Sequence, residues 1–316
     1  MHYRTLGRTG LHVSDVGFGA MTIGGEIFGA TDDHESLRAL QRAVDLGMNF
    51  IDTADAYGRG HSEELLGHLL RTRRKEVVLA TKGGNEFTVR QGLRNFDPDY
   101  ITSALEASLK RLQIETIDLY QLHNPSPEVM RRGDIFERLE RCKREGKIRF
   151  YGVSLEKTAD GLVAIETGKP DTLQVVYNIL HQDPEVQLFP LAQKENIGIL
   201  ARVPLERGVL SGRFQTRDEF VEKDWRRGVF PEDGLAQTRA AVEKLDFLLK
   251  GDVPNLAQAA LRFILSHPAV STVIPGIRTV RQIEDNLTVS GKSLAREDLE
   301  RVRALYRSEF CHLPFH

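Results

Sequence analysis

Four polar residues stand at or just after apolar runs of the chain, and their types could together perform acid–base chemistry. Asp52 and Tyr57 lie five residues apart, after the short and largely apolar run 49–51. Lys82 follows the run 77–81, and His123 follows the run 117–122. A phenol is a poor proton donor at neutral pH, but a nearby ammonium stabilises the phenolate, and a carboxylate keeps that ammonium charged and oriented. A histidine within reach could hold the substrate oxygen or relay a proton.

Each of these residues also has a purely structural interpretation. Asp52 could cap a loop, Tyr57 could be an aromatic residue at a rim, and Lys82 could be a solvated charge. His123 could be a histidine satisfied by its neighbours. Four complementary groups at corresponding positions favour a shared acid–base site over four separate structural roles.

The elements that must position these groups alternate along the chain. Eight apolar runs, most of them continuous, are typical of parallel strands covered on both faces. These predicted strands are 16–20, 49–52, 77–81, 117–122, 148–154, 173–177, 197–201 and 271–274. Segments with helical periodicity lie between them, among them 35–46, 63–71, 99–112, 135–145 and 256–266. Eight alternations predict one (β/α)8 barrel, an α/β TIM barrel over residues 1–316, with a doubly wound sheet as the alternative.

Two segments depart from the alternation. Residues 3–7 and 11–14 flank a turn at 8–10, which predicts a β-hairpin before the first barrel strand. A long loop is predicted after the seventh strand, at 213–235, and it carries Trp225, the only tryptophan of the chain. Such a loop is either a surface excursion or a lid that closes over a ligand.

Bulk composition narrows the class of protein. The chain has 316 residues, of which 41% are hydrophobic and 28% charged, with a formal net charge of -2. We therefore expect neither nucleic acid nor a membrane as a partner. The two cysteines, Cys142 and Cys311, form no CxxC pair or disulfide framework, and no compact His/Cys spacing predicts a metal site. Together with the absence of an apolar signal segment, this favours a cytoplasmic protein.

Further motifs occur in a fixed order along nearly the whole chain. They are 4–14 (RTLGRTGLHVS), Asp52 with Glu63-Glu64 and Gly67, 118–123 (DLYQLH), 152–154 (GVS), 174–178 (QVVYN), 204–212 (PLERGVLSG) and 274–276 (IPG). In this order they resemble the aldo-keto reductase family, in particular its bacterial branch, which is also similar to potassium-channel β subunits.

The resemblance implies a role for each catalytic candidate. Tyr57 would be the general acid that protonates the carbonyl oxygen as hydride arrives, and Lys82 would lower the cost of that proton transfer. Asp52 would pair with Lys82, and His123 would orient the carbonyl. The implied activity is oxidoreduction, with aldehydes or ketones reduced to alcohols by hydride from NADPH. The glycines at 17 and 19 do not continue into a GxGxxG fingerprint, which agrees with a family that binds its cofactor without one.

The resemblance also implies an extended nicotinamide cofactor across the barrel mouth. Ser154 and Gln174 would hold the carboxamide, and Pro204, Leu205 and Arg213 would cover the pyrophosphate. The remaining implied cofactor contacts are Met21, Arg202, Gly276, Arg278, Gln282, Asp285 and Asn286.

Three positions depart from the commoner family pattern. Arg202 stands where many members have an aromatic residue against the nicotinamide, and Leu155 stands where an Asn or Arg is frequent. Gly276 stands where many eukaryotic members have a lysine beside the 2′-phosphate. Arg278, just before a predicted helix at 280–287, could replace that lysine, which favours NADP and its reduced form NADPH while leaving NADH possible.

Alternative functions remain open from the residues alone. The channel resemblance allows a cofactor-binding module that senses redox state without turnover. An aldolase that uses Lys82 as a Schiff base is a third class, since barrels host many chemistries. The identity of the carbonyl substrate, the physiological direction, and the choice between a monomer and a small homo-oligomer are not decided by the sequence.

Overall fold

Eight parallel strands form a curved sheet, and each strand pairs with the next one along the chain. The computed structural model describes residues 1–25, 31–86, 93–212 and 234–313. The strands, in their order across the sheet, are β3 (Phe18–Gly19), β4 (Phe50–Asp52), β5 (Val78–Gly83), β8 (Ile117–His123), β9 (Ile148–Ser154), β10 (Thr172–Val176), β11 (Gly198–Arg202) and β12 (Val270–Val273). Parallel bridges from Val16 to Val273 and from Gly19 to Gly276 connect the two edges of the sheet. This connectivity excludes the doubly wound alternative.

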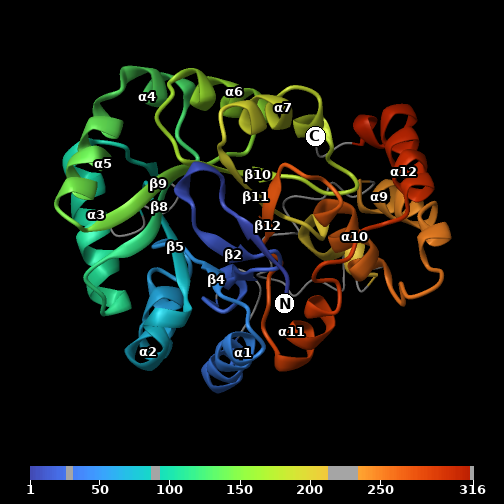
Figure 1. The fold of residues 1–316 in the computed structure, drawn as a ribbon, viewed down its shortest axis with the longest axis horizontal. Helices are drawn as coiled ribbons and strands as arrows, with labels where there is room; N and C mark the ends of the chain where they lie inside the picture. The colour runs from blue at the N-terminus through green and yellow to red at the C-terminus, as the bar shows by residue number, and fades with distance from the viewer. Residues whose placement is uncertain (26–30, 87–92, 213–233, 314–316) are drawn as a thin grey trace.

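Helices connect successive strands and cover the outside of the sheet (Figure 1). They are α1 (Asp33–Asp45), α2 (His61–Arg73), α3 (Pro98–Leu112), α4 (Pro127–Arg132), α5 (Asp134–Arg144), α6 (Thr158–Glu166), α7 (Leu188–Lys194), α9 (Gly234–Glu243), α10 (Leu256–Leu265), α11 (Val280–Leu287) and α12 (Arg296–Ser308). Side chains at the ends of several helices explain where these begin. Asp32 and Asp97 accept hydrogen bonds from the first amides of α1 and α3, and Thr279 forms a capping box with Gln282 at α11.

A short antiparallel pair precedes the first barrel strand. β1 (Tyr3–Thr5) pairs with β2 (His12–Ser14), and Figure 1 shows this segment in front of the barrel strands. Leu6, Leu11 and Val13 form a hydrophobic cluster with residues of the barrel interior. Arg4 adds a polar attachment by donating to the carbonyl oxygens of Leu265 and Val270 at 2.6 and 2.8 Å. The N-terminal segment therefore covers the barrel end from which the strands begin.

The residues of several barrel strands alternate between two hydrophobic clusters, as a two-residue period requires. Phe50, Ala80, Leu119 and Leu200 belong to the inner cluster with the hairpin. Neighbouring residues such as Ile51, Leu79 and Ile199 belong to the larger cluster under the helices. The position two residues beyond an inner-cluster residue therefore points into the barrel near its other end.

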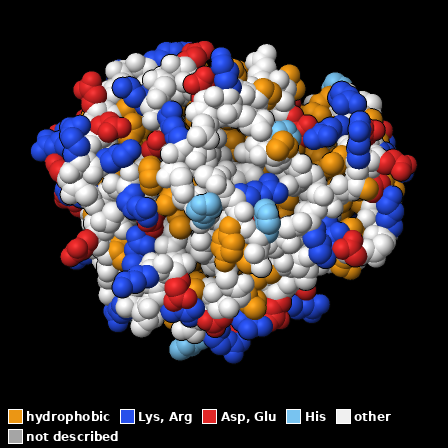
Figure 2. Space-filling view, viewed as in Figure 1, with side chains coloured by type: hydrophobic (Ala, Val, Ile, Leu, Met, Phe, Trp, Pro, Cys, Tyr) orange, Lys and Arg blue, Asp and Glu red, His pale blue; other side chains and the backbone are white. Residues whose placement is uncertain are grey.

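One segment of the fold was not predicted, and one predicted segment lies largely outside the described residues. A second hairpin, β6 (Asn85–Glu86) with β7 (Leu93–Arg94), is inserted between β5 and α3 and was not predicted from the sequence. The predicted lid, 213–235, lies almost entirely outside the described residues. Its last two residues, Gly234 and Leu235, are described and belong to α9. On the face shown in Figure 2, basic and acidic side chains are interspersed rather than segregated.

Candidate active site

The alternation of the strands brings the predicted catalytic residues together at one end of the barrel. Asp52 lies two residues beyond Phe50, Lys82 two beyond Ala80, and His123 four beyond Leu119. Asp52 and His123 end β4 and β8, and Lys82 is the fifth residue of the six-residue strand β5. The sequence predicted that Lys82 would follow its strand, but in the structure Lys82 lies within the strand.

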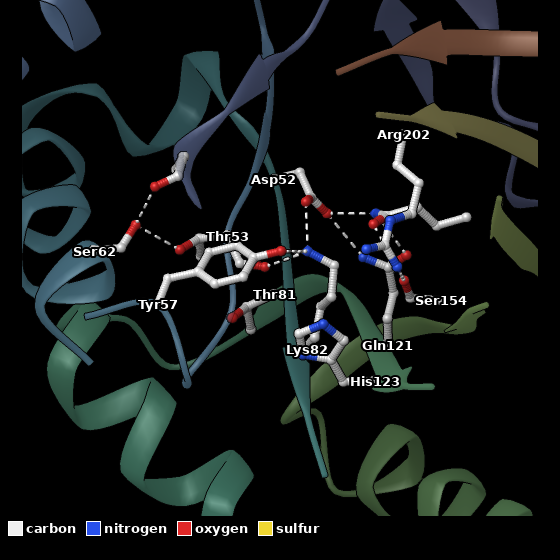
Figure 3. Close-up of polar contacts among 12 residues, drawn as sticks. Asp52, Thr53, Tyr57, Ser62, Thr81, Lys82, Gln121, His123, Ser154 and Arg202 are labelled. Atoms are coloured by element: carbon white, nitrogen blue, oxygen red, sulfur yellow. Dashed lines mark hydrogen bonds and ion pairs between the residues drawn. The ribbon is translucent and has the colours of Figure 1, made fainter. Parts of the chain in front are cut away.

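Lys82 is the centre of the hydrogen-bond network (Figure 3). Its ammonium donates to Asp52 Oδ1 at 2.5 Å, to the Thr53 carbonyl oxygen at 2.9 Å and to Tyr57 Oη at 3.1 Å. An ammonium has three N–H donors, so these contacts use all of them. The hydrogen of the Tyr57 hydroxyl must therefore point away from Lys82, and it is available to another acceptor.

The charge of Lys82 is balanced in a fully buried setting. The side chain is 0% exposed, so a solvated strand-end charge is excluded. Burial lowers the pKa of Lys82, but the charge of Asp52 and the contact with Tyr57 act in the opposite direction and leave the pKa above its ordinary value. Lys82 is therefore an ammonium at neutral pH, which removes the Schiff-base alternative because that chemistry needs the neutral amine.

Two glutamines fix the other oxygen of Asp52. Gln121 Nε2 and Gln174 Nε2 donate to Asp52 Oδ2 at 3.0 and 2.8 Å, and all three residues are buried. Gln174 in turn accepts a hydrogen bond from Ser154 Oγ at 3.3 Å. The carboxylate is thus held by donors on both oxygens, which fixes the position of its partner Lys82.

His123 faces Tyr57 and is held by a residue of the second hairpin. The two rings meet edge to face with centroids 6.0 Å apart. Burial, followed by the charges of Lys82, Arg202 and Arg94, lowers the pKa of His123 well below 6.5, so the ring is neutral. Its Nδ1 lies 2.9 Å from Nδ2 of Asn85, which can only donate. Nδ1 must therefore accept, and the proton of the neutral ring resides on Nε2.

This arrangement predicts a single tautomer of His123. We expect ¹⁵N NMR of histidine-labelled protein to show Nε2–H imidazole from pH 8 down to pH 5.5, because protonation of the ring is opposed by burial and neighbouring cations. Asn85→Asp should move the proton of His123 from Nε2 to Nδ1, since a carboxylate at residue 85 can only accept a hydrogen bond. Asn85→Ser, which can still donate, is the control. An imidazolium signal near pH 6.5 in the unsubstituted protein would contradict the assignment.

A large cavity opens beside these groups. Its volume is about 1210 Å³, and Asp52, Tyr57 and Gln174 line one part of it. Most of the predicted cofactor contacts line it too, namely Met21, Gln174, Arg202, Pro204, Leu205, Gly276, Arg278, Gln282, Asp285 and Asn286. Ser154 is fully buried just behind Gln174, and Arg213 lies outside the described residues.

The backbone amides at the start of α11 bear on the distal part of this cavity. Arg278 lies just before this helix, but several of the amides there already have partners. Gln282 Oε1 accepts from Arg278 N at 2.7 Å and from Thr279 N at 3.3 Å, and Glu35 Oε1 accepts from Val280 N at 3.3 Å. An anion here would therefore depend on side chains such as Arg278 and not on the helix terminus.

Packing explains two of the unusual positions. A Cβ at Gly276 would lie 2.8 Å from Thr22 Cγ2, so a side chain at residue 276 would force Thr22 to move. Leu155 is 1% exposed and belongs to the core under the helices, so it is not placed to contact a cofactor.

Arg202, the third unusual position, ends β11 and points across the barrel mouth. Its Nη1 donates to Ser154 Oγ and to Asn124 Oδ1, both at 3.3 Å. In Figure 3 Arg202 and Ser154 lie on the side of Asp52 opposite Tyr57.

The loop after β11 has an unusual backbone. Val203, Glu206 and Arg207 all have positive φ, of 55°, 41° and 53°, and for a β-branched residue this is costly. Buried Asn178 holds the loop by donating to the Val203 carbonyl oxygen and to Glu206 Oε2, each at 2.9 Å. The three strained residues all line the cavity, which indicates that its shape is imposed by this loop.

Several residues of the site were not predicted from the sequence. Asn85, Gln121, Asn124, Asn178 and Glu206 act through contacts with residues distant in the chain. No motif marks Asn85 or Asn124, and the motifs that contain the other three assigned them no role. For Gln121 a signal did exist, because it lies two residues before His123 on the same strand and so faces the same interior.

The site thus consists of a buried lysine and carboxylate and a half-buried tyrosine at the mouth of a parallel barrel, beside a large cavity. Comparison with known proteins gives the class: the "Aldo/keto reductase family" profile matches residues 15–307. The chain belongs to this family of oxidoreductases.

Individual relatives agree with this assignment. The aldo-keto reductase YhdN of Bacillus subtilis is 33% identical over 314 residues, which cover 96% of this chain and 93% of YhdN. The aldo-keto reductase yakc [NADP(+)] of Schizosaccharomyces pombe is 32% identical, covering 92% and 88% of the two chains. The solved holo form of aldo-keto reductase AKR11C1 from Bacillus halodurans superimposes with a TM-score of 0.80 at 31% identity, covering 96% of both chains.

The described residues were also searched for membrane-spanning helices and for metal sites. None of their helices has the length and apolar character needed to span a membrane. Within the same part of the chain, no group of three or more His, Cys, Asp or Glu side chains is placed to hold a metal ion.

Proposed function

We propose that the protein reduces aldehydes or ketones to alcohols with NADPH, and that Tyr57 donates the proton. The observation that carries this proposal is the contact of the Lys82 ammonium with both Asp52 and Tyr57 Oη. A tyrosine whose oxygen accepts from a buried ammonium can give up its proton at low cost, because the resulting phenolate is stabilised where it forms.

The chain's own residues would act in a defined order. His123 would donate from Nε2 to the carbonyl oxygen and fix its direction, as its neutral form allows. Tyr57 would give its free hydroxyl proton to the same oxygen while hydride from the nicotinamide reaches the carbonyl carbon. Lys82, held by Asp52, would stabilise the tyrosinate until it is protonated again.

The cavity fits a nicotinamide dinucleotide in size and in the chemistry of its walls. Gln174 lines the cavity and accepts from Ser154, and these two residues would hold the carboxamide. The strained loop with Pro204 and Leu205 would cover the pyrophosphate together with Arg213. Gly276, Arg278, Gln282, Asp285 and Asn286 would surround the adenosine end, and Met21, which lines the same cavity, would be a further cofactor contact. The names of yakc [NADP(+)] and of the AKR11C1 holo form support a bound cofactor of this kind.

The test is a panel of carbonyl compounds assayed with NADPH and NADH side by side. We expect loss of reduced-nicotinamide absorbance with at least one aldehyde or ketone. A panel of short aldehydes, α-dicarbonyls, sugars and aromatic aldehydes that gave no turnover, with cofactor bound, would overturn the proposal. A redox sensor without turnover would then be the better description, and no feature of the site favours it at present.

Arg278 is the residue on which we expect the preference for NADPH to depend. Arg278→Met should raise the KM for NADPH roughly 10- to 100-fold, as expected for one charged hydrogen bond lost, and leave the KM for NADH nearly unchanged. Initial rates with both cofactors and one carbonyl measure this. An equal rise in both KM values would show that Arg278 does not read the 2′-phosphate.

The remaining parts of the proposal concern the whole chain. We infer that residues 1–316 form one (β/α)8 barrel domain, that the protein is cytoplasmic, and that it is a monomer or a small homo-oligomer. Size-exclusion chromatography with light scattering would decide the oligomeric state.

A further inference from the structure

Arg202 carries a charge that has no acidic partner in the described part of the chain. Its contacts are Ser154 Oγ and Asn124 Oδ1, both neutral, and only Nη1 takes part in them. Lys82, the other cation at the centre of the site, is matched by Asp52 at 2.5 Å. The guanidinium is half-buried and lines the cavity together with Tyr57 and Gln174.

The position of Arg202 relative to a reacting nicotinamide follows from the chemistry. Hydride transfer requires the donor carbon to lie about 3–3.5 Å from a carbonyl carbon that Tyr57 and His123 hold by its oxygen. The ring would then lie beside Tyr57, in the cavity that Gln174 and Arg202 also line. The charge of Arg202 acts on this end of the barrel, since it is one of the cations that lower the pKa of His123.

We propose that Arg202 makes the protein discriminate between the redox forms of its cofactor, binding the reduced form more tightly and releasing the oxidised form. This inference rests on the function proposed above. When hydride leaves, the neutral ring becomes a pyridinium with one added positive charge. An unmatched guanidinium nearby repels that charge, so the oxidised form loses affinity while the reduced form does not.

The consequence for the reaction is specific. The same repulsion makes loss of hydride from the bound cofactor less favourable, so Arg202 gives no advantage to the chemical step. Its effect lies in loading the reduced cofactor in the presence of the oxidised one and in releasing the oxidised product. The oxidised cofactor, which is a product of carbonyl reduction, would then inhibit this direction only weakly.

The test measures affinity and not turnover. NADPH is titrated by its fluorescence, and NADP+ by displacement of NADPH at one fixed salt concentration. Arg202→Met removes the charge and keeps an unbranched side chain. In this variant we expect the ratio Kd(NADP+)/Kd(NADPH) to fall about tenfold. Unscreened charges would give a larger change, but water in the cavity screens the repulsion. For a two-electron couple this lowers the potential of the bound cofactor by about 30 mV.

Two further variants separate charge from shape. Arg202→Lys keeps the charge and should keep most of the ratio. Arg278→Gln removes a cation from the distal end of the cavity, where oxidation changes no charge, and should weaken both forms equally.

The proposal is overturned if Arg202→Met leaves the ratio unchanged, if Arg202→Lys lowers it as much, or if Arg278→Gln shifts it to the same extent. If the unsubstituted protein binds neither form, the proposed function fails together with this inference. Binding of both forms with an unchanged ratio overturns the inference alone.

Discussion

Tyr57→Phe is expected to reduce kcat by roughly 10²–10⁴ while the affinity for NADPH stays the same. The substitution removes one oxygen, the atom that accepts from Lys82 at 3.1 Å and whose proton points toward the cavity. The aromatic ring and its edge-to-face contact with His123 remain. Single-turnover measurement of cofactor oxidation, with a saturating carbonyl, reports the chemical step directly.

A matched control distinguishes loss of the proton donor from general damage. Tyr100→Phe removes another half-buried tyrosine hydroxyl, one that donates to the Asn85 carbonyl oxygen at 3.4 Å, and it should leave turnover within a few-fold. Should Tyr57→Phe retain full activity, the role of Tyr57 as general acid would be wrong, and another donor would have to be found.

Lys82→Met is expected to abolish measurable turnover and to destabilise the fold by about 3–5 kcal/mol. The large effect on stability arises because Asp52 would remain in a buried position without its cationic partner. Its remaining donors, Gln121 and Gln174, are neutral. Denaturant unfolding followed by circular dichroism measures the change, with activity assayed on the folded fraction.

The double variant Asp52→Asn with Lys82→Met separates the two effects. Removing both charges should restore much of the lost stability, since no uncompensated carboxylate remains, whereas activity should stay absent. If the double variant is as unstable as Lys82→Met alone, packing and not charge pairing explains the loss. Recovery of activity in the double variant would show that Lys82 does not assist Tyr57.

Much of the site could be predicted from the sequence because side chains along a strand alternate between its two faces every two residues. Continuous apolar runs placed the strands to within one or two residues, and the polar residue at each carboxyl end was then expected at the barrel mouth. Asp52, Lys82 and His123 were found in this way, and the structure places them around Tyr57. Their roles in catalysis remain predictions.

The parts that escaped prediction depend on tertiary contacts. Nothing near Asn85 indicates that it would reach His123, because the second hairpin that carries it is set by pairing with Leu93 and Arg94. The hydrogen bonds from Arg278 N to Gln282 and from Val280 N to the distant Glu35 were not predicted either. Helices such as α6 and α12 were not predicted either, and α12 combines many charges with a narrow apolar stripe.

The hairpin at the start of the chain has a kinetic consequence. Since β1 and β2 cover one end of the barrel, small molecules must enter and leave through the other. In the proposed arrangement the nicotinamide would lie against buried Gln174 and Ser154, and the carbonyl compound would lie toward Tyr57 and His123. We therefore expect the two ligands, which would share one opening, to bind in a compulsory order, with the cofactor entering first and leaving last.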